Sequence, residues 1–244
     1  MNKNTVILCI SLLLILGLGA VTYGVFIKNH SQSIKGNAII DWVDFVMLNG
    51  HSYTGLYDGV LVERSKITDH VVGKVNFKVG DVVSNPNYRT KEGDAAFLAI
   101  GTKLYEVKGY KPEEIIVAED KGMIGGYRIY VENSYSKTLN SRSFKDLPVE
   151  QISKIELYKI NEMTPYRTLV DNEQADFIHL LKSGEYKPTY MPNSQNGDPT
   201  YYRMVFYTDE PIANAFSIAD DGDHVFFYPA DLSIVDNRIR SLLE

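Results

Sequence analysis

The chain has 244 residues, of which 44% are hydrophobic, and its formal net charge is −6. This length and composition are typical of a folded protein of one or two domains and exclude a fully disordered chain. Residues 1–28 contain two lysines and no acidic residue, so residues 29–244 carry a charge of −8. Because a phosphate-binding surface needs clustered Lys and Arg, this balance excludes nucleic acid as the expected partner.

The amino-terminal segment Thr5–Ile27 is a run of 23 uncharged, mostly apolar residues. A helix of that length measures about 34 Å, which is enough to span the hydrocarbon core of a bilayer, about 30 Å thick. We interpret residues 1–37 as a membrane anchor with a polar juxtamembrane linker, and we expect a single-pass protein of the cell membrane with an extracytoplasmic body. A cleaved signal peptide is the alternative, although its apolar region is usually only about 7–15 residues long.

Cysteine usage agrees with an external location. The only cysteine, Cys9, lies inside the apolar run, so the rest of the chain has no disulfide framework and no cysteine metal site. Exported domains without cysteine fit organisms that do not oxidise secreted thiols.

Residues 38–135 predict a β-rich module. Apolar residues alternate with polar ones most clearly at Val71–Val79. Asn49-Gly50 supplies the positive φ angles of a tight hairpin turn after a strand within 39–48. Further strands are predicted at 95–98, 103–107, 114–119 and 127–131. Several short strands separated by Gly, Asn and Asp are typical of a small barrel or a sandwich.

Residues 144–244 predict a small α+β module, preceded by a polar linker or long loop at 133–143. The predicted order of elements is β-α-β-β-β-α. The first helix is expected to begin near Asp171, with a capping acid three residues before Gln174, and to end at Gly184. The second helix is expected to run from about Leu232 to Leu243. Strands are predicted at 154–160, 201–208, 212–219 and 224–228.

Residues 85–110 contain Gly93-Asp94-Ala95-Ala96-Phe97-Leu98, followed by Gly101-Thr102, Tyr105 and Lys108-Gly109-Tyr110. This stretch, together with 177–190 and 201–244, resembles uncharacterised membrane-anchored or lipoprotein-like extracytoplasmic proteins of Gram-positive bacteria. The resemblance covers about half of the chain and contains no catalytic motif. It implies an exported bacterial protein and supplies no site residues.

The sequence contains no motif for nucleophilic or zinc catalysis, since it lacks a G-x-S-x-G elbow and an H-E-x-x-H pair. One candidate metal site is the turn formed by Asp220, Asp221 and Asp223, because three carboxylates in a turn can supply oxygen ligands to Ca²⁺. Asp and Gly are also the preferred residues of ordinary turns, and the spacing differs from that of an EF-hand. No other cofactor is predicted.

Three functional hypotheses follow. The first is a membrane-anchored extracytoplasmic binding or regulatory protein without catalytic activity, which recognises a protein or cell-envelope partner. The second is a cell-envelope hydrolase that uses paired carboxylates. Its candidate residues are Asp41, Asp44, Glu63 and Asp94. The third is a structural subunit of an envelope complex. The absence of a catalytic motif favours the first.

Overall fold

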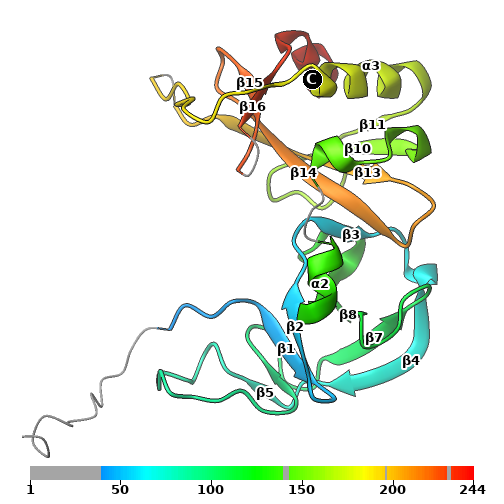
Figure 1. Cartoon of the computed structure of the whole chain (residues 1–244), viewed down its shortest axis with the longest axis vertical. Helices are drawn as coiled ribbons and strands as arrows, with labels where there is room; N and C mark the ends of the chain where they lie inside the picture. Colours follow the sequence, from blue (N-terminus) through cyan, green and yellow to red (C-terminus); the bar gives the residue numbers. More distant parts are fainter. Residues whose placement is uncertain (1–39, 140–142, 196, 230–231) are drawn as a thin grey trace, which may run out of the picture. The chain divides into compact units, whose positions relative to one another are not determined.

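The computed structural model describes residues 40–139, 143–195, 197–229 and 232–244 (Figure 1). The predicted anchor, Thr5–Ile27, lies outside these residues. Within them, no helix combines the length and hydropathy needed to cross a bilayer. The described chain is mainly β, with two eight-stranded sheets and few helices, which confirms the predicted predominance of strands.

The first sheet has the strand order β4-β7-β8-β9-β2-β1-β6-β5. All neighbouring strands are antiparallel except the parallel pair β5 and β6. In chain order its strands are β1 (Phe45–Leu48), β2 (His51–Gly55), β4 (Ile67–Lys74), β5 (Phe77–Lys78), β6 (Asp94–Ala95), β7 (Lys103–Val107), β8 (Ile115–Glu119) and β9 (Tyr127–Glu132). The central strand β8 is apolar on both faces, with Ile116 and Ala118 in one buried cluster and Ile115 and Val117 in another.

The predicted hairpin turn is confirmed. Asn49 and Gly50 have φ values of 53° and 77° and connect β1 to β2 in register. Two consecutive positive φ angles give the turn a twist that matches that of the strands it joins. Glu92 reinforces the turn, because its carboxylate accepts hydrogen bonds from the backbone N–H groups of Asn49 (2.7 Å) and Gly50 (3.1 Å).

The second sheet has the order β11-β10-β13-β14-β15-β16-β12, and β3 pairs with β14. Its strands are β3 (Gly59–Leu61), β10 (Lys154–Lys159), β11 (Arg167–Leu169), β12 (Glu185–Tyr186), β13 (Thr200–Tyr207), β14 (Ile212–Asp220), β15 (Val225–Phe227) and β16 (Ser233–Val235). Strand β3 therefore comes from the amino-terminal half of the chain but pairs with the carboxy-terminal sheet. Both sheets belong to one compact unit, residues 42–82 and 89–244.

Of the described residues, 40–41 and 83–88 are grouped in a separate unit. Residues 83–88 form a local turn in which the Tyr88 N–H donates to the carbonyl of Asn85 over 3.0 Å.

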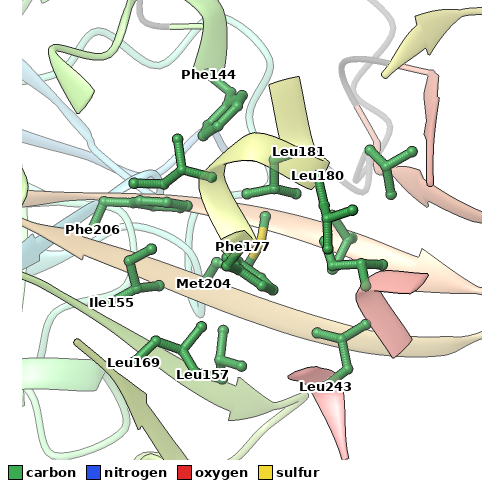
Figure 2. Close-up of a cluster of buried hydrophobic side chains, with 14 of the residues drawn as sticks. Phe144, Ile155, Leu157, Leu169, Phe177, Leu180, Leu181, Met204, Phe206 and Leu243 are labelled. Atoms are coloured by element: carbon green, nitrogen blue, oxygen red, sulfur yellow. The ribbon is translucent and has the colours of Figure 1, made fainter. Parts of the chain in front are cut away.

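One face of the second sheet packs against helix α3 (Asp171–Lys182). Figure 2 shows Phe177 pointing from the helix toward Met204 and Leu157 on the strands. All three side chains are buried, and Phe144 and Phe206 extend the same cluster with ring centroids 5.6 Å apart. Fully burying a side chain of this size contributes about 1.5–3 kcal/mol. The helix is therefore fixed to the sheet by its apolar stripe, as its sequence pattern predicts.

One expectation for α3 needs correction. The residue before the helix, Val170, takes the N-cap position without a side-chain hydrogen bond, so the predicted acidic cap at Asp171 does not form. Gln174 instead donates through its Nε2 to the carbonyl of Ile152 over 2.8 Å. Gln174 thus bonds to a residue distant in sequence and makes no capping-box hydrogen bond at the start of the helix.

The predicted helix over 232–243 is wrong for most of its length. Ser233–Val235 forms β16, Asn237–Ile239 is a 3₁₀ turn, and only Arg240–Leu243 is α-helical, as α4. Short apolar runs fit either period, and here pairing with β15 and β12 decided the outcome. The predicted linker 133–143 is also wrong in part, because α2 (Asn133–Leu139) follows β9 directly.

The predicted strand Val71–Val79 is divided in two. Strand β4 ends at Lys74 and β5 begins at Phe77, although Val75 and Val79 are buried as the alternation indicates. The Val75 N–H donates to the carbonyl of Thr102, and the Asn76 N–H donates to the carbonyl of Gly93, so the backbone changes partner at this point. The strand predicted over 39–48 begins only at Phe45, and the one predicted over 95–98 is reduced to β6.

A buried ionic cluster connects β1 to β9. The carboxylate of Asp44 has no exposed side-chain surface and accepts hydrogen bonds from Arg128 Nη1 (3.0 Å), the Tyr130 hydroxyl (3.0 Å) and the Tyr57 hydroxyl (3.2 Å). Burial, with the nearby Asp44 carboxylate, raises the pKa of Tyr130, so its hydroxyl stays a donor. A Cβ at Gly55 would lie 2.8 Å from Asp44 Oδ2, so the cluster requires glycine there.

Replacing Asp44 with Asn is expected to lower the free energy of unfolding by about 3 kcal/mol, because Arg128 then loses a buried counter-charge. The matched control is Asp69→Asn, since Asp69 is fully exposed and pairs with Arg64 at 3.3 Å at the surface. That change is expected to leave stability nearly unaltered. Urea unfolding of the full chain, followed by circular dichroism, measures both. Equal effects of the two substitutions would contradict a structural role for Asp44.

Candidate functional site

A small cavity of about 160 Å³ opens beside the second sheet. Its walls come from the residues around β3, from the turn between β8 and β9, and from the segment that follows β10, and Arg203 of β13 completes the lining. We call this cavity the Arg203 pocket. Its lining residues are Tyr57, Gly59, Val60, Gly122, Met123, Ile124, Lys159, Ile160, Asn161, Glu162, Met163 and Arg203.

Strand β3 determines where the Arg203 pocket forms. Val60 pairs with Ala213 of β14, and the Ala215 N–H donates to the carbonyl of Asp58 over 2.9 Å. The turn after β8 lies close to β3, because a Cβ at Gly125 would lie only 2.4 Å from the carbonyl oxygen of Leu61. Gly125 also has a φ of 78°, which favours glycine. The two halves of the chain thus meet at this cavity.

Arg203 is the chemically distinctive residue of the pocket. Its Nη2 donates to the backbone carbonyl of Tyr57, and it is the cross-strand partner of Tyr158. Within the described residues, no carboxylate forms an ion pair with its guanidinium. Burial lowers the pKa of Arg203, and the charge of Asp58 opposes this only in part. An arginine stays protonated in proteins, so the pocket holds a partly desolvated positive charge that, within the described residues, is near Asp58 but forms no direct ion pair.

The rim of the pocket is apolar and exposed. Tyr57, Ile160 and Met163 are 53%, 54% and 41% exposed and all line the cavity. Single exposed apolar residues are normal on protein surfaces, and here three of them surround one cavity. The turn that carries Ile160 is set by Asn161, whose φ of 64° is tolerated by Asn better than by most residues.

Two further charged residues line the Arg203 pocket. Lys159 is exposed, and its Nζ lies 5.8 Å from the ring centroid of Tyr166. Glu162 is also exposed. With Arg203 these residues give the pocket a formal charge of +1, in a chain that is acidic as a whole.

The structure directs the three carboxylates of the predicted calcium site to different donors. Asp220 accepts from Arg240 Nε and Nη2, at 2.7 and 2.8 Å. Asp221 accepts from the hydroxyl of Tyr190, and Asp223 accepts from Asn193 Nδ2 over 2.8 Å. In the ranges that the structure describes, no three His, Cys, Asp or Glu side chains are grouped as a metal site would require. Calcium binding at this turn stays a prediction from the sequence.

Asp221 fastens the loop around Tyr190 to the turn before β15. Its carboxylate accepts from the N–H groups of Asn193 (2.8 Å), Asp223 (3.0 Å) and His224 (2.8 Å), besides the hydroxyl of Tyr190. Burial by itself raises the pKa of Asp221, but these hydrogen bonds outweigh burial and lower the pKa to about 2. The role of Asp221 within the described structure is therefore to hold a loop in place.

The carboxylates of the hydrolase hypothesis do not line the Arg203 pocket. Asp44 is committed to Arg128 and two tyrosines, and Asp94 is buried and accepts from the Lys91 N–H over 2.7 Å. Glu63 is exposed. Asp41 is exposed and belongs to the separate unit.

Arg203 matches no motif of the sequence and was not among the predicted functional residues. The available signal was its position as the only charged residue within the predicted strand 201–208. A charged side chain in an otherwise apolar and aromatic strand needs a partner or a function.

Comparison of the chain with protein-family models, with curated proteins and with solved structures gave no match. The site is therefore described by its geometry and chemistry alone.

Substituting Asp221 with Asn is expected to destabilise the protein by about 1–2 kcal/mol at neutral pH, because a charged hydrogen-bond acceptor is lost. The pKa of Asp221 is lower in the folded state than in the unfolded chain, so its contribution is fully present above about pH 4. It is lost as the pH falls from about 4 to 2. Urea unfolding between pH 7 and pH 2 should show the stabilities of the two proteins converging in acid.

The control is Asp209→Asn, an exposed carboxylate for which the structure shows no partner in the described residues. A difference between wild type and Asp221→Asn that stays constant down to pH 2 would contradict this account.

Proposed function

We propose that this protein is a membrane-anchored, extracytoplasmic binding protein without catalytic activity, which recognises its ligand through the Arg203 pocket. The observation that carries the proposal is the partly buried guanidinium of Arg203, which has no ionic partner in the described chain. Desolvating a charge is costly unless it is paired, so a site that maintains such a charge is suited to an anionic group of a partner.

The apolar rim supports the same proposal. A ligand that covers Ile160 and Met163 would remove exposed apolar surface from water, which favours association. A typical binding site combines such apolar walls with a few polar groups that orient the ligand. The Arg203 pocket has both.

The proposal also includes the finer architecture expected from the sequence. Residues 38–135 would be a small barrel-like module and residues 144–244 a small α+β module. The order of the first sheet and the packing of α3 on the second support this division. The pairing of β3 with β14 means that the two modules would share a strand between them.

Attachment to the membrane would come from Thr5–Ile27. The length of this segment and its lack of charge support a spanning helix. The resemblance of residues 85–110, 177–190 and 201–244 to exported Gram-positive proteins supports an external location. Tethering confines a binding module to a thin layer beside the membrane, so even a weak contact with an envelope partner becomes effective.

Deletion of residues 1–37 is expected to move the protein from the membrane to the soluble fraction, because the only long apolar segment is removed. Expression of the full and shortened chains in bacteria, followed by fractionation, measures this. Protease added to spheroplasts is expected to digest the body of the full-length protein. Recovery of the full chain in the cytosol, or protection of its body from the protease, would reject the proposed location. The intact mass of the mature protein shows whether the segment is retained or cleaved.

A photo-crosslinking residue placed at position 163 is expected to capture the ligand in intact cells, since Met163 lies on the rim of the Arg203 pocket. The matched control is the same residue at position 191, because Met191 is 84% exposed and lies outside the pocket. Mass spectrometry of the purified protein identifies the adduct. Equal adducts at both positions, or no adduct at either, would count against the pocket as the binding site.

A further inference from the structure

We infer that the Arg203 pocket binds a monocarboxylate attached to a short apolar group, with the carboxylate on Arg203 and the apolar group on Ile160 and Met163. This inference rests on the proposed binding function and specifies its ligand class.

The anionic half of the ligand follows from the free donors of Arg203. A guanidinium has five N–H donors in a planar fork, and among the described residues Arg203 makes only the donation from Nη2 to the Tyr57 carbonyl. The fork matches the two oxygens of a carboxylate, which it binds through two parallel hydrogen bonds. A carboxylate on Arg203 would form the direct ion pair that Arg203 lacks within the described residues and would accept from its remaining donors.

A single negative charge fits the pocket better than a phosphate dianion. The pocket has a formal charge of +1, because Glu162 offsets one of its two cations. The surrounding protein is acidic, with a net charge of −6 for the whole chain, and this field disfavours a second negative charge on the ligand. Asp58 adds a further negative charge near Arg203, so a monocarboxylate, which brings less negative charge than a phosphate dianion, fits the site better.

The apolar half follows from the rim and from the size of the cavity. Ile160 and Met163 offer exposed aliphatic surface beside the arginine. The cavity measures about 160 Å³, which is below the range of about 300–1,000 Å³ found for pockets that hold drug-sized ligands. It therefore suits one short branched chain rather than an extended acyl chain.

Two sources can present this chemistry: a free small acid, and the carboxyl terminus of a polypeptide that ends in an aliphatic residue. Both would place the same groups on the same residues. Peptides with free and amidated carboxyl termini, compared with a small free acid, distinguish the two sources.

The probes are 4-methylpentanoate and its primary amide, which have the same shape and differ in charge. NMR titration of the full chain in nanodiscs is expected to give a Kd of about 1 mM for the acid, as suits so small a ligand. The amide is expected to bind at least tenfold more weakly, and it also controls for partition into the lipid.

The source is tested with the peptide Ala-Ala-Ala-Leu carrying a free or an amidated terminus. If the peptide with the free terminus binds and the amidated peptide does not, the carboxylate is assigned to a polypeptide terminus. Failure of both peptides, with binding of 4-methylpentanoate, would assign it to a small acid.

The variants Ile160→Asp and Ile160→Lys provide a matched pair. Both remove the same exposed apolar side chain, but one brings a negative charge to the rim and the other a positive charge. Ile160→Asp is expected to weaken binding of the acid at least tenfold relative to Ile160→Lys. Arg203→Gln is expected to abolish the preference for the acid over the amide. Because Arg203 also bonds to Tyr57, its variant is first checked by circular dichroism, and the Ile160 pair tests the inference without altering Arg203.

Equal binding of the acid and the amide, equal binding by the two Ile160 variants, or preferential binding of inorganic phosphate would overturn the ligand class. An adduct at position 163 in cells together with equal binding of the acid and the amide would leave the binding function intact and reject only the carboxylate. Loss of both the adduct and the binding would reject the function as well.

Discussion

The pairing of β3 with β14 is the constraint on which the candidate site depends. Three residues from the amino-terminal half of the chain, Gly59–Leu61, form a ladder with Ile212–Asn214 of the second sheet. This pairing buries Val60 and Leu61 and brings the carbonyl of Tyr57 to Arg203. The wall of the pocket is thus a consequence of backbone hydrogen bonding between segments about 150 residues apart in the chain.

The partners of the buried and partly buried charged residues distinguish Asp44 and Asp221, which stabilise the fold, from Arg203, the proposed binding residue. Asp44 has an arginine and two tyrosine hydroxyls around its carboxylate, and Asp221 has a tyrosine and three backbone N–H groups. Both are fully committed to neighbours in the fold, as buried charges normally are. Arg203 is only partly buried, and within the described residues it forms no direct ion pair, although the nearby Asp58 carboxylate favours its charge. That contrast, within one molecule, is the reason for assigning recognition to Arg203.

The two kinds of charged group are also connected. Tyr57 donates its hydroxyl to Asp44 and accepts from Arg203 at its carbonyl, so one residue joins the structural cluster to the pocket. Its ring is 53% exposed on the pocket rim. The rigidity of the Asp44 cluster therefore helps to fix the position of the groups that would meet a ligand.

Local patterns in the sequence predicted the elements whose stability is local. Asn49-Gly50 determined its own hairpin, because the positive φ angles are a property of those two residues. Helix α3 and the strands at 103–107 and 127–131 were also predicted correctly. In each, the spacing of apolar residues along the sequence matches the periodicity of the element and marks the face that it buries. The length of the last helix was overestimated, because the short run at residues 233–235 fits a helix or a strand equally well. Its pairing with β12 and β15 made it a strand, and this pairing is not visible in the local sequence.

The sequence by itself determined that the chain folds mainly into strands, that it begins with a long uncharged apolar segment, and that it lacks familiar catalytic motifs. Only the tertiary structure decided which charges are neutralised. The sequence marked Asp221 as a candidate calcium ligand and Asp44 as a candidate catalytic carboxylate, but it could not show the partners of these residues or of Arg203, because the partner of a side chain depends on segments brought together by folding. The Arg203 pocket could not be predicted for the same reason: its walls come from four separate parts of the chain, and they meet only when β3 pairs with β14.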